Sequence, residues 1–372
     1  MGVLALVAGV AFSGGTSVDP PAPRGFPGVV PAFLASARAA PIEGARARAD
    51  EGVWAARQRD RRWLARARAL GPAAPRWART IYRRSLLVLR AFVDPHGAAV
   101  AGARVGWAYV WPRDAGAVAL ALASAGYRAE ARRVAHFLLG LDLGAAARFH
   151  RSGEPVEGRG AQGDAAGWVR AAARAAGVAH PVGVPAPAWR DRADYQEGDA
   201  GDYLGNAIAS HTSLEAFETG PGLVRAAGDA GSGLDSAAAW AVRPFARPAF
   251  YPAARRTLLN LIADRGTRFG IVPSERWHGG DEPWTAPTAW CAWSLATLSR
   301  IERRAGRSRA ALTDRRTALG LMADLRRAAT PLDLLPERVD PHTGAPTSTT
   351  PLAWSHAFAI LAIRALWPEA RR

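Results

Sequence analysis

The sequence predicts an all-α fold, a toroid of helical hairpins, for this chain of 372 residues. Apolar residues recur at three- and four-residue spacing, which is typical of helices, and strict alternation is scarce. Long loops rich in glycine, proline and tryptophan recur beside successive helix pairs; they comprise Gly102–Pro112, Ala188–Asp202, Val272–Pro287 and Pro336–Pro351. Because functional sites usually lie in such loops, we expect a ring of hairpins whose long connections surround a site on one face.

Residues 1–30 are expected to be a signal-like or disordered leader. Residues 3–12 form an apolar run, but a helix needs about 20 apolar residues to span a bilayer, so we expect no stable membrane insertion. The run is similar to the hydrophobic part of a signal peptide, although the charged segment that normally precedes it is missing. The sequence therefore leaves both a cytoplasmic and a secreted location open.

Residues 31–76 are expected to be an N-terminal helical extension. The segment Arg46–Arg79 carries Trp54 and Trp63 among many arginines and predicts one basic amphipathic helix. Such a helix can bind a membrane surface, but a solvated outer helix is the commoner structure for this pattern. We expect the solvated arrangement, with the main domain over residues 77–372.

Five later segments each predict one buried helix face. The spacing of their apolar and small residues at i, i+3, i+4 and i+7 places each set on one side of a helix. The sets are Leu86, Leu89 and Val93; Val134, Phe137, Leu138 and Leu141; Trp290, Trp293, Ser294 and Thr297; Leu312, Leu319 and Met322; and Phe358, Leu361 and Ala365.

Composition narrows the classes of function. The chain has 48 basic and 32 acidic residues, a net charge of +16, and every basic residue is arginine. The arginines are spread among alanines along the whole length, which favours a compositional bias over a nucleic-acid interface. The single cysteine, Cys291, excludes an internal disulfide, and the scattered histidines lack the spacing of metal ligands. We therefore expect no metal site and no nucleic-acid partner.

One loop combines three aromatic residues with a charged pair. Trp107, Tyr109 and Trp111 are followed directly by Arg113 and Asp114, just before a predicted helix. Aromatic rings pack on the apolar faces of sugars, while a carboxylate and a guanidinium bind adjacent hydroxyl groups. Asp114 could instead only cap the helix. Capping does not explain the aromatic residues, so the loop predicts a binding site.

A second cluster follows a helix near the C-terminus. Glu337 lies within Leu335–Gly344, and Pro351–His356 follows shortly after. A lone glutamate in a loop would usually form a surface ion pair. Another short motif, Gln162–Asp164, predicts a helix start with Asp164 as its capping residue, and a substrate role there is less favoured.

These clusters together resemble glycoside hydrolase family 15, the glucoamylase-like enzymes that include bacterial glucan hydrolases and trehalases. The resemblance spans residue 77 to the C-terminus and depends on motif order. Its motifs are Tyr109–Asp114, Gln162–Asp164, Asp194–Glu197, Asp235–Phe245, Pro273–Trp284 and Leu335–His356. It implies an (α/α)6 toroid, or six-hairpin glycosidase fold. It also implies an inverting, exo-acting hydrolase similar to glucan 1,4-α-glucosidase, which needs no cofactor and releases glucose from α-glucans or oligosaccharides.

The resemblance also implies the roles of individual residues. Glu337 matches the general base, and Glu197 is the best candidate for the acid, although Gln196 stands where the motif usually has tryptophan. Arg113 and Asp114 would hold the terminal sugar. Trp111 and Tyr109 would line the innermost subsite, and Trp107 would bind substrate from a position where an aromatic residue is also expected.

Glu275 competes with Glu197 for the acid role. By resemblance its motif belongs to the penultimate hairpin, so Glu275 more readily lines the pocket with Arg276, Trp277 and Trp284. Two other functions stay open at this point. They are a trehalase-like hydrolysis of a small α-glucoside and carbohydrate binding without catalysis.

Overall fold

The computed structural model describes residues 46–179 and 188–369, with side chains from residue 54 onward. The leader at 1–30 and the first part of the helical extension lie outside the described residues. The α-helices are α3 (Arg46–Leu64), α4 (Arg76–Phe92), α5 (Pro112–Ser124), α6 (Arg128–Leu139), α7 (Ala165–Ala176), α8 (Leu204–Ala209), α9 (Ala238–Val242), α10 (Tyr251–Arg265), α11 (Thr285–Arg304), α12 (Ser308–Ala328) and α13 (Ala353–Leu366). Short 3-10 helices η1 and η2 cover Glu215–Phe217 and Pro248–Phe250.

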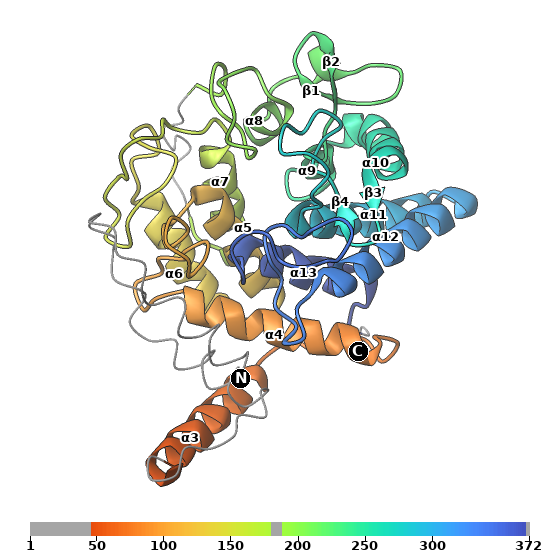
Figure 1. The fold of residues 1–372 in the computed structure, drawn as a ribbon. Coiled ribbons are helices and arrows are strands. Elements are labelled where there is room, and N and C mark those ends of the chain that lie inside the picture. Colours follow the sequence, from red (N-terminus) through yellow and green to blue (C-terminus); the bar gives the residue numbers. More distant parts are fainter. Residues whose placement is uncertain (1–45, 180–187, 370–372) are drawn as a thin grey trace.

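Among the described elements, six inner helices form a closed ring. In order of contact they are α5, α7, α8, α9, α11 and α13, and α13 packs back against α5. Around them, α4 packs on α13, α6 packs on α5 and α7, and α10 and α12 cover α9 and α11 (Figure 1). This arrangement confirms the predicted all-α toroid.

The outer layer is thinner beside α8 and α9. Where an outer helix would follow α8, the described chain has η1 and an antiparallel hairpin, β1 (Val224–Ala226) with β2 (Asp229–Leu234). A second small hairpin, β3 (Gly266–Thr267) with β4 (Gly270–Ile271), follows α10. Neither hairpin was predicted. The strands β1, β3 and β4 have only two or three residues each, and the six residues of β2 (DAGSGL) show no alternation of apolar and polar residues.

Glycines allow these short inner helices to pack closely. A Cβ atom on Gly167 in α7 would lie 2.3 Å from the carbonyl oxygen of Ala209. One on Gly205 in α8 would lie 2.9 Å from the ring of Trp240 in α9. Since real Cβ atoms do not come so close, only glycine permits this helix spacing.

Aromatic side chains fill the centre of the ring. Trp168 of α7 meets Trp240 of α9 edge to face at 5.1 Å between ring centroids, and Trp240 meets Trp290 of α11 at 5.3 Å. Phe358 of α13 contacts both Trp290 and Trp168, at 5.4 and 6.0 Å. Such pairs contribute about 0.5–1.5 kcal/mol each beyond simple burial. The toroid axis is therefore a packed core, and a site can form only at its ends.

The N-terminal helix differs from its prediction. The expected single helix over Arg46–Arg79 is two helices, because Pro72 and Pro75 lie between α3 and α4 and proline cannot continue a helix. Trp63 is buried and stacks on Tyr127 at 3.9 Å. This contact anchors the end of α3 to the toroid.

One predicted helix face is also wrong in part. Leu312 on α12 is 48% exposed, whereas its neighbour Ala311 is buried together with Ala318 and Leu325. Their seven-residue spacing directs these three residues towards the core, and Leu312 lies about 100° around the helix from Ala311. In the described part of the chain, no helix has the length and apolar character to cross a membrane.

Candidate active site

A cavity of about 170 Å³ lies where the inner helices α5, α11 and α13 begin. Its walls come from segments far apart in the sequence, which the toroid brings together at one end. The side chains that line it include Trp107, Trp111, Arg113, Asp114, Arg148, Arg159, Tyr195, Gln196, Glu197, Trp284, Glu337, Leu352 and Trp354. Both proposed catalytic glutamates are in this set.

The first turn of α5 places a buried charged pair in the wall. Arg113 donates to Oε1 of Gln162 at 2.8 Å and to Oδ2 of Asp164 at 3.2 Å, and it lies over the ring of Trp354 at 5.0 Å. The Arg113 guanidinium is 3.6 Å from Asp114. Asp164 makes no capping hydrogen bond to α7. The predicted capping role is therefore wrong, because the Asp164 carboxylate accepts a hydrogen bond from the buried Arg113 guanidinium instead.

Burial changes the acidity of Asp114. Its pKa is raised to about 7, chiefly because the carboxyl is desolvated. Arg113 acts against this shift, while Glu337 and Asp164 add to it by charge repulsion. Near neutral pH both protonation states are populated, so Asp114 can donate to or accept from a hydroxyl group.

Glu337 sits in a loop whose backbone is held by hydrogen bonds to the start of α11 and to a neighbouring loop segment. Its backbone N–H donates to Thr349 at 2.9 Å, and its carbonyl accepts from the N–H of Thr285 at the start of α11, at 3.1 Å. The Ser348 hydroxyl donates to the Glu337 carboxylate, and the Arg338 Nε is 3.9 Å from it. The side chain is only 14% exposed. The Ser348 hydroxyl and the Arg338 guanidinium are thus the polar neighbours of this carboxylate.

His356 holds this loop from behind. The N–H of Leu335 donates to Nε2 of His356 at 3.0 Å, so the neutral ring carries its proton on Nδ1. Nδ1 lies 2.8 Å from the Ser85 hydroxyl on α4 and donates to it. Burial lowers the pKa of His356 to about 3, with a smaller contribution from Arg84. His356 is a positioning residue for the Glu337 loop, a role that its sequence motif did not reveal.

Glu197 reaches the same cavity from the opposite loop. Its backbone is left-handed, with φ of 55°, which is uncommon for a residue with a side chain. The side chain is 29% exposed and forms an ion pair with Arg159. Glu197 is thus more open to solvent than Glu337.

Gln196 belongs to a buried polar network beside Glu197. Its amide donates to Asp235 at 2.8 Å and to the Tyr195 hydroxyl at 3.0 Å. Burial and the neighbouring Asp194 raise the pKa of Asp235 to about 7, while Arg225 opposes the shift. Arg225 itself donates twice to Asp194, at 3.0 and 3.2 Å. An amide satisfies this network where an indole could donate only one hydrogen bond.

Tryptophans form the apolar walls. Trp107, Trp111 and Trp284 line the cavity. Tyr109 is not among the lining residues; it contacts the ring of Trp111 at 6.3 Å, and the Arg148 guanidinium lies over both rings. In the described residues, the indole N–H groups of Trp111, Trp284 and Trp354 are buried without a hydrogen-bond partner. Trp168, Trp240 and Trp277 share this feature outside the cavity, so an unpaired indole N–H does not by itself mark a ligand site.

The third predicted group lies mostly behind the wall. Glu275 accepts a hydrogen bond from the N–H of Leu234 at 2.8 Å and does not line the cavity. Arg276 is exposed, and neither it nor Trp277 lines the cavity. Trp277 packs edge to face against Trp284 at 5.0 Å. Only Trp284 of this group reaches the cavity itself.

Sequence reasoning missed three prominent wall residues. Trp354 lies in the quoted motif Pro351–His356, whose tryptophan was a usable signal. Arg148 and Arg159 carry no local signal, because they are two of 48 basic residues spread over the chain. Their selection depends on the loop between α6 and α7 folding back over α5, where Phe149 pairs with Val110.

Comparisons with known proteins show the fold. No family model and no curated protein matches the sequence. A solved glycosidase matches with a TM-score of 0.59 at 19% identity, over 78% of this chain and 97% of that one. A glucoamylase from Saccharomycopsis fibuligera matches with a TM-score of 0.61 at 13% identity, over 80% and 96% of the two chains. One from Hormoconis resinae matches at 0.62 and 13%, over 79% and 74%. The chain therefore has a glucoamylase-like glycosidase fold.

Proposed function

We propose that the protein is an inverting, exo-acting glycoside hydrolase that releases glucose from the non-reducing ends of α-glucans or oligosaccharides. One observation carries the proposal: Glu197 and Glu337 line the same small cavity at one end of the toroid. Inversion requires two carboxyl groups on opposite sides of the scissile bond, one acid and one base. A carbohydrate is thus the expected partner, and no cofactor takes part in this chemistry.

The shape and lining of the cavity support a terminal sugar as the ligand. Its volume of about 170 Å³ suits one sugar ring better than a chain of sugars. It falls below the roughly 300 Å³ at which pockets for drug-sized ligands begin. The rings of Trp107, Trp111 and Trp284 in the cavity wall can pack on the apolar face of a sugar. Arg113 and Asp114 supply charged partners at the same end. One glycosidase of similar fold, at 18% identity, is described in complex with glucose.

The proposed mechanism is a single displacement. Glu197 donates a proton to the leaving oxygen as the bond to the anomeric carbon breaks. Glu337 removes a proton from the attacking water on the other side of the ring. The hydrogen bond from the Ser348 hydroxyl fixes the position of the Glu337 carboxylate for this role.

The ion pair at Glu197 favours a second candidate, carbohydrate binding without turnover. A guanidinium beside a carboxyl group stabilises its ionised form, and an acid catalyst must hold a proton. For hydrolysis, a bound sugar must therefore separate Arg159 from Glu197. A small disaccharide that enters the cavity whole would instead favour trehalase-like activity, so soluble starch, isomaltose and trehalose should be assayed side by side.

The first test replaces the proposed base. Glu337→Gln should abolish hydrolysis while oligosaccharide binding is retained, because the amide keeps the shape but cannot accept the proton. Glu275→Gln is the matched control, since Glu275 lies outside the cavity. If the wild-type protein binds oligosaccharides but does not hydrolyse them, the hydrolase proposal is refuted and carbohydrate binding without turnover takes its place.

The second test addresses the acid. Glu197→Gln should be inactive on natural glucosides and partly active on substrates with a good leaving group, because protonation of the departing oxygen then matters less. Glu337→Gln should gain nothing from the better leaving group. Full activity of Glu197→Gln with loss in Glu275→Gln would move the acid role to Glu275. Retention of the anomeric configuration, measured by NMR, would overturn single displacement.

A further inference from the structure

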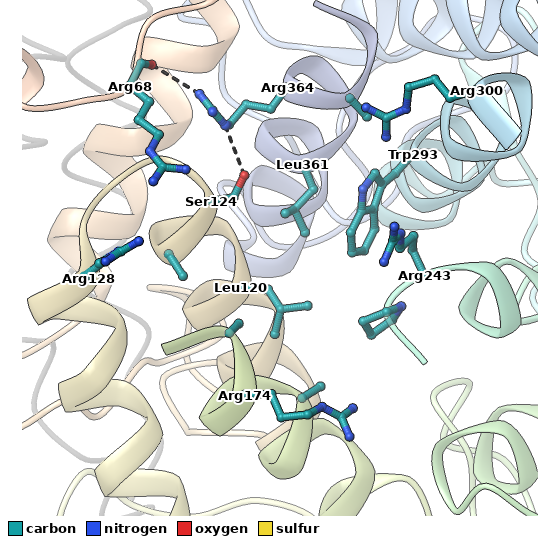
Figure 2. A pocket seen from close by; sticks show the side chains of 15 residues that line it. Arg68, Leu120, Ser124, Arg128, Arg174, Arg243, Trp293, Arg300, Leu361 and Arg364 are labelled. Carbon is teal, nitrogen blue, oxygen red and sulfur yellow. Dashed lines mark hydrogen bonds between the residues drawn. The ribbon is translucent and has the colours of Figure 1, made fainter. Parts of the chain in front are cut away.

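A second cavity, of about 620 Å³, opens at the other end of the toroid. Six arginines are among the described residues that line it, and none of those lining residues is acidic. We call it the arginine cavity; its arginines are Arg68, Arg128, Arg174, Arg243, Arg300 and Arg364. Figure 2 shows their side chains around a floor that includes Trp293, Leu120 and Leu361.

The arginine cavity is separate from the candidate active site. On α5, Asp114 in the first turn lines the active-site cavity, and Ser124 at the last residue lines the arginine cavity. Ten residues of helix rise about 15 Å. Trp354 and Arg364 have the same relation on α13. The aromatic core of the toroid lies between the two cavities.

Among the residues that the structure describes, no acidic side chain neutralises the positive charge in this cavity. Of the described residues, no carboxylate lies within 4.0 Å of the six guanidinium groups. Arg364 donates instead to neutral oxygens, the Ser124 hydroxyl at 3.1 Å and the Arg68 carbonyl at 3.3 Å (Figure 2). Burial lowers the pKa of Arg300, and the like charges of Arg243 and Arg304 lower it further.

Helix dipoles do not account for so many arginines. Arg174 and Arg364 lie in the last turns of α7 and α13, and Arg243 follows the end of α9. Ser124, the last residue of α5, also lines the cavity. Each helix C-terminus carries a charge equivalent to about −0.5, so these four ends offset about two positive charges. Six arginines leave most of their charge for an external anion.

We propose that the arginine cavity binds a small ligand that carries two or more phosphate groups. Guanidinium groups bind phosphate oxygens in pairs, with geometry that a single ammonium cannot match. The volume falls within the roughly 300–1,000 Å³ of small-molecule sites. The apolar floor adds room for an uncharged body beside the phosphates. This site is independent of the proposed hydrolase activity.

Calorimetric titration of the full chain tests the proposal. Tripolyphosphate should bind at physiological ionic strength at least tenfold more tightly than sulfate. Arg243→Gln with Arg300→Gln should weaken that binding at least tenfold. The matched control, Arg133→Gln with Arg316→Gln, removes the same charge from exposed positions on α6 and α12 and should change it less than twofold.

Further titrations distinguish a nucleotide from an inorganic polyphosphate as the ligand. Tighter binding of ATP than of tripolyphosphate would assign a nucleotide whose base uses the floor near Trp293, and equal binding would assign an inorganic polyphosphate chain. A second double variant, Arg128→Gln with Arg174→Gln, guards against a folding defect in the first, and near-UV circular dichroism checks both. Equal losses in the site and control variants, no preference over sulfate, or displacement of tripolyphosphate by duplex DNA would overturn the proposal.

Discussion

His356 should make the stability of the protein depend on pH. In the folded chain its pKa is lowered from 6.5 to about 3, because the ring is fully buried and, to a smaller extent, because of the positive charge of Arg84. Between these two pH values the unfolded chain binds a proton that the folded chain does not. The free energy of unfolding must therefore fall as the pH drops below 6.5 and level off near pH 3.

The size of this effect follows from the shift. One pKa unit corresponds to about 1.4 kcal/mol. Between pH 6.5 and pH 3 the free energy of unfolding should therefore fall by about 5 kcal/mol in total, and between pH 7 and pH 5 by about 2 kcal/mol. His356→Gln removes the titrating group. At pH 7 the variant should be less stable by about 1 kcal/mol or more, because the hydrogen bond to Ser85 is lost.

The assay is urea unfolding of both proteins at pH 7, 6 and 5, followed by circular dichroism. The stability gap between wild type and His356→Gln should close as the pH falls. Asp114 and Asp235, whose pKa values are raised, act in the opposite direction but equally in both proteins. His342→Gln, at an exposed histidine, should show a constant gap. A constant gap for His356→Gln as well would refute the assigned ring contacts.

Three further predictions concern the site and the packing. Asp114→Ala should lower turnover at least tenfold with an unchanged near-UV spectrum, because a charge-assisted hydrogen bond contributes roughly 1.5–3 kcal/mol; near-normal kinetics would remove Asp114 from the subsite. Gly167→Val should lower the melting temperature steeply because of the clash with Ala209, whereas Gly320→Ala, in open space on α12, should raise it slightly. Trp63→Ala should cost about 3–5 kcal/mol and speed amide exchange in α3, and unchanged exchange would show that α3 does not depend on this contact.

The sequence by itself determined the helical class and much of the order of the helices. Periodic apolar residues predicted α4, α6, α11 and α13 because each helix buries a face whose repeat is local. The loop of Trp111, Arg113 and Asp114 could be selected for a similar reason, since the whole cluster lies within eight residues of chain. Short elements such as β1, with three residues, were beyond this signal.

Only the tertiary structure decided which side chains meet. The sequence could not separate Glu197 from Glu275; the fold directs Glu197 into the cavity and uses Glu275 to hold the backbone at Leu234. Gln196 stood out as a departure from a motif, and the buried Asp235 explains why an amide fits there.

The arginines show the same limit most clearly. Along the chain they are uniform, so no window of sequence distinguishes those of the active-site cavity from those of the arginine cavity. Closure of the ring brings the helix starts together at one end and several helix ends together at the other. The periodicity of apolar residues indicates whether a residue faces the core. Which side chains meet at either end of the toroid depends on contacts between helices that are far apart in the sequence. No local sequence pattern encodes those contacts.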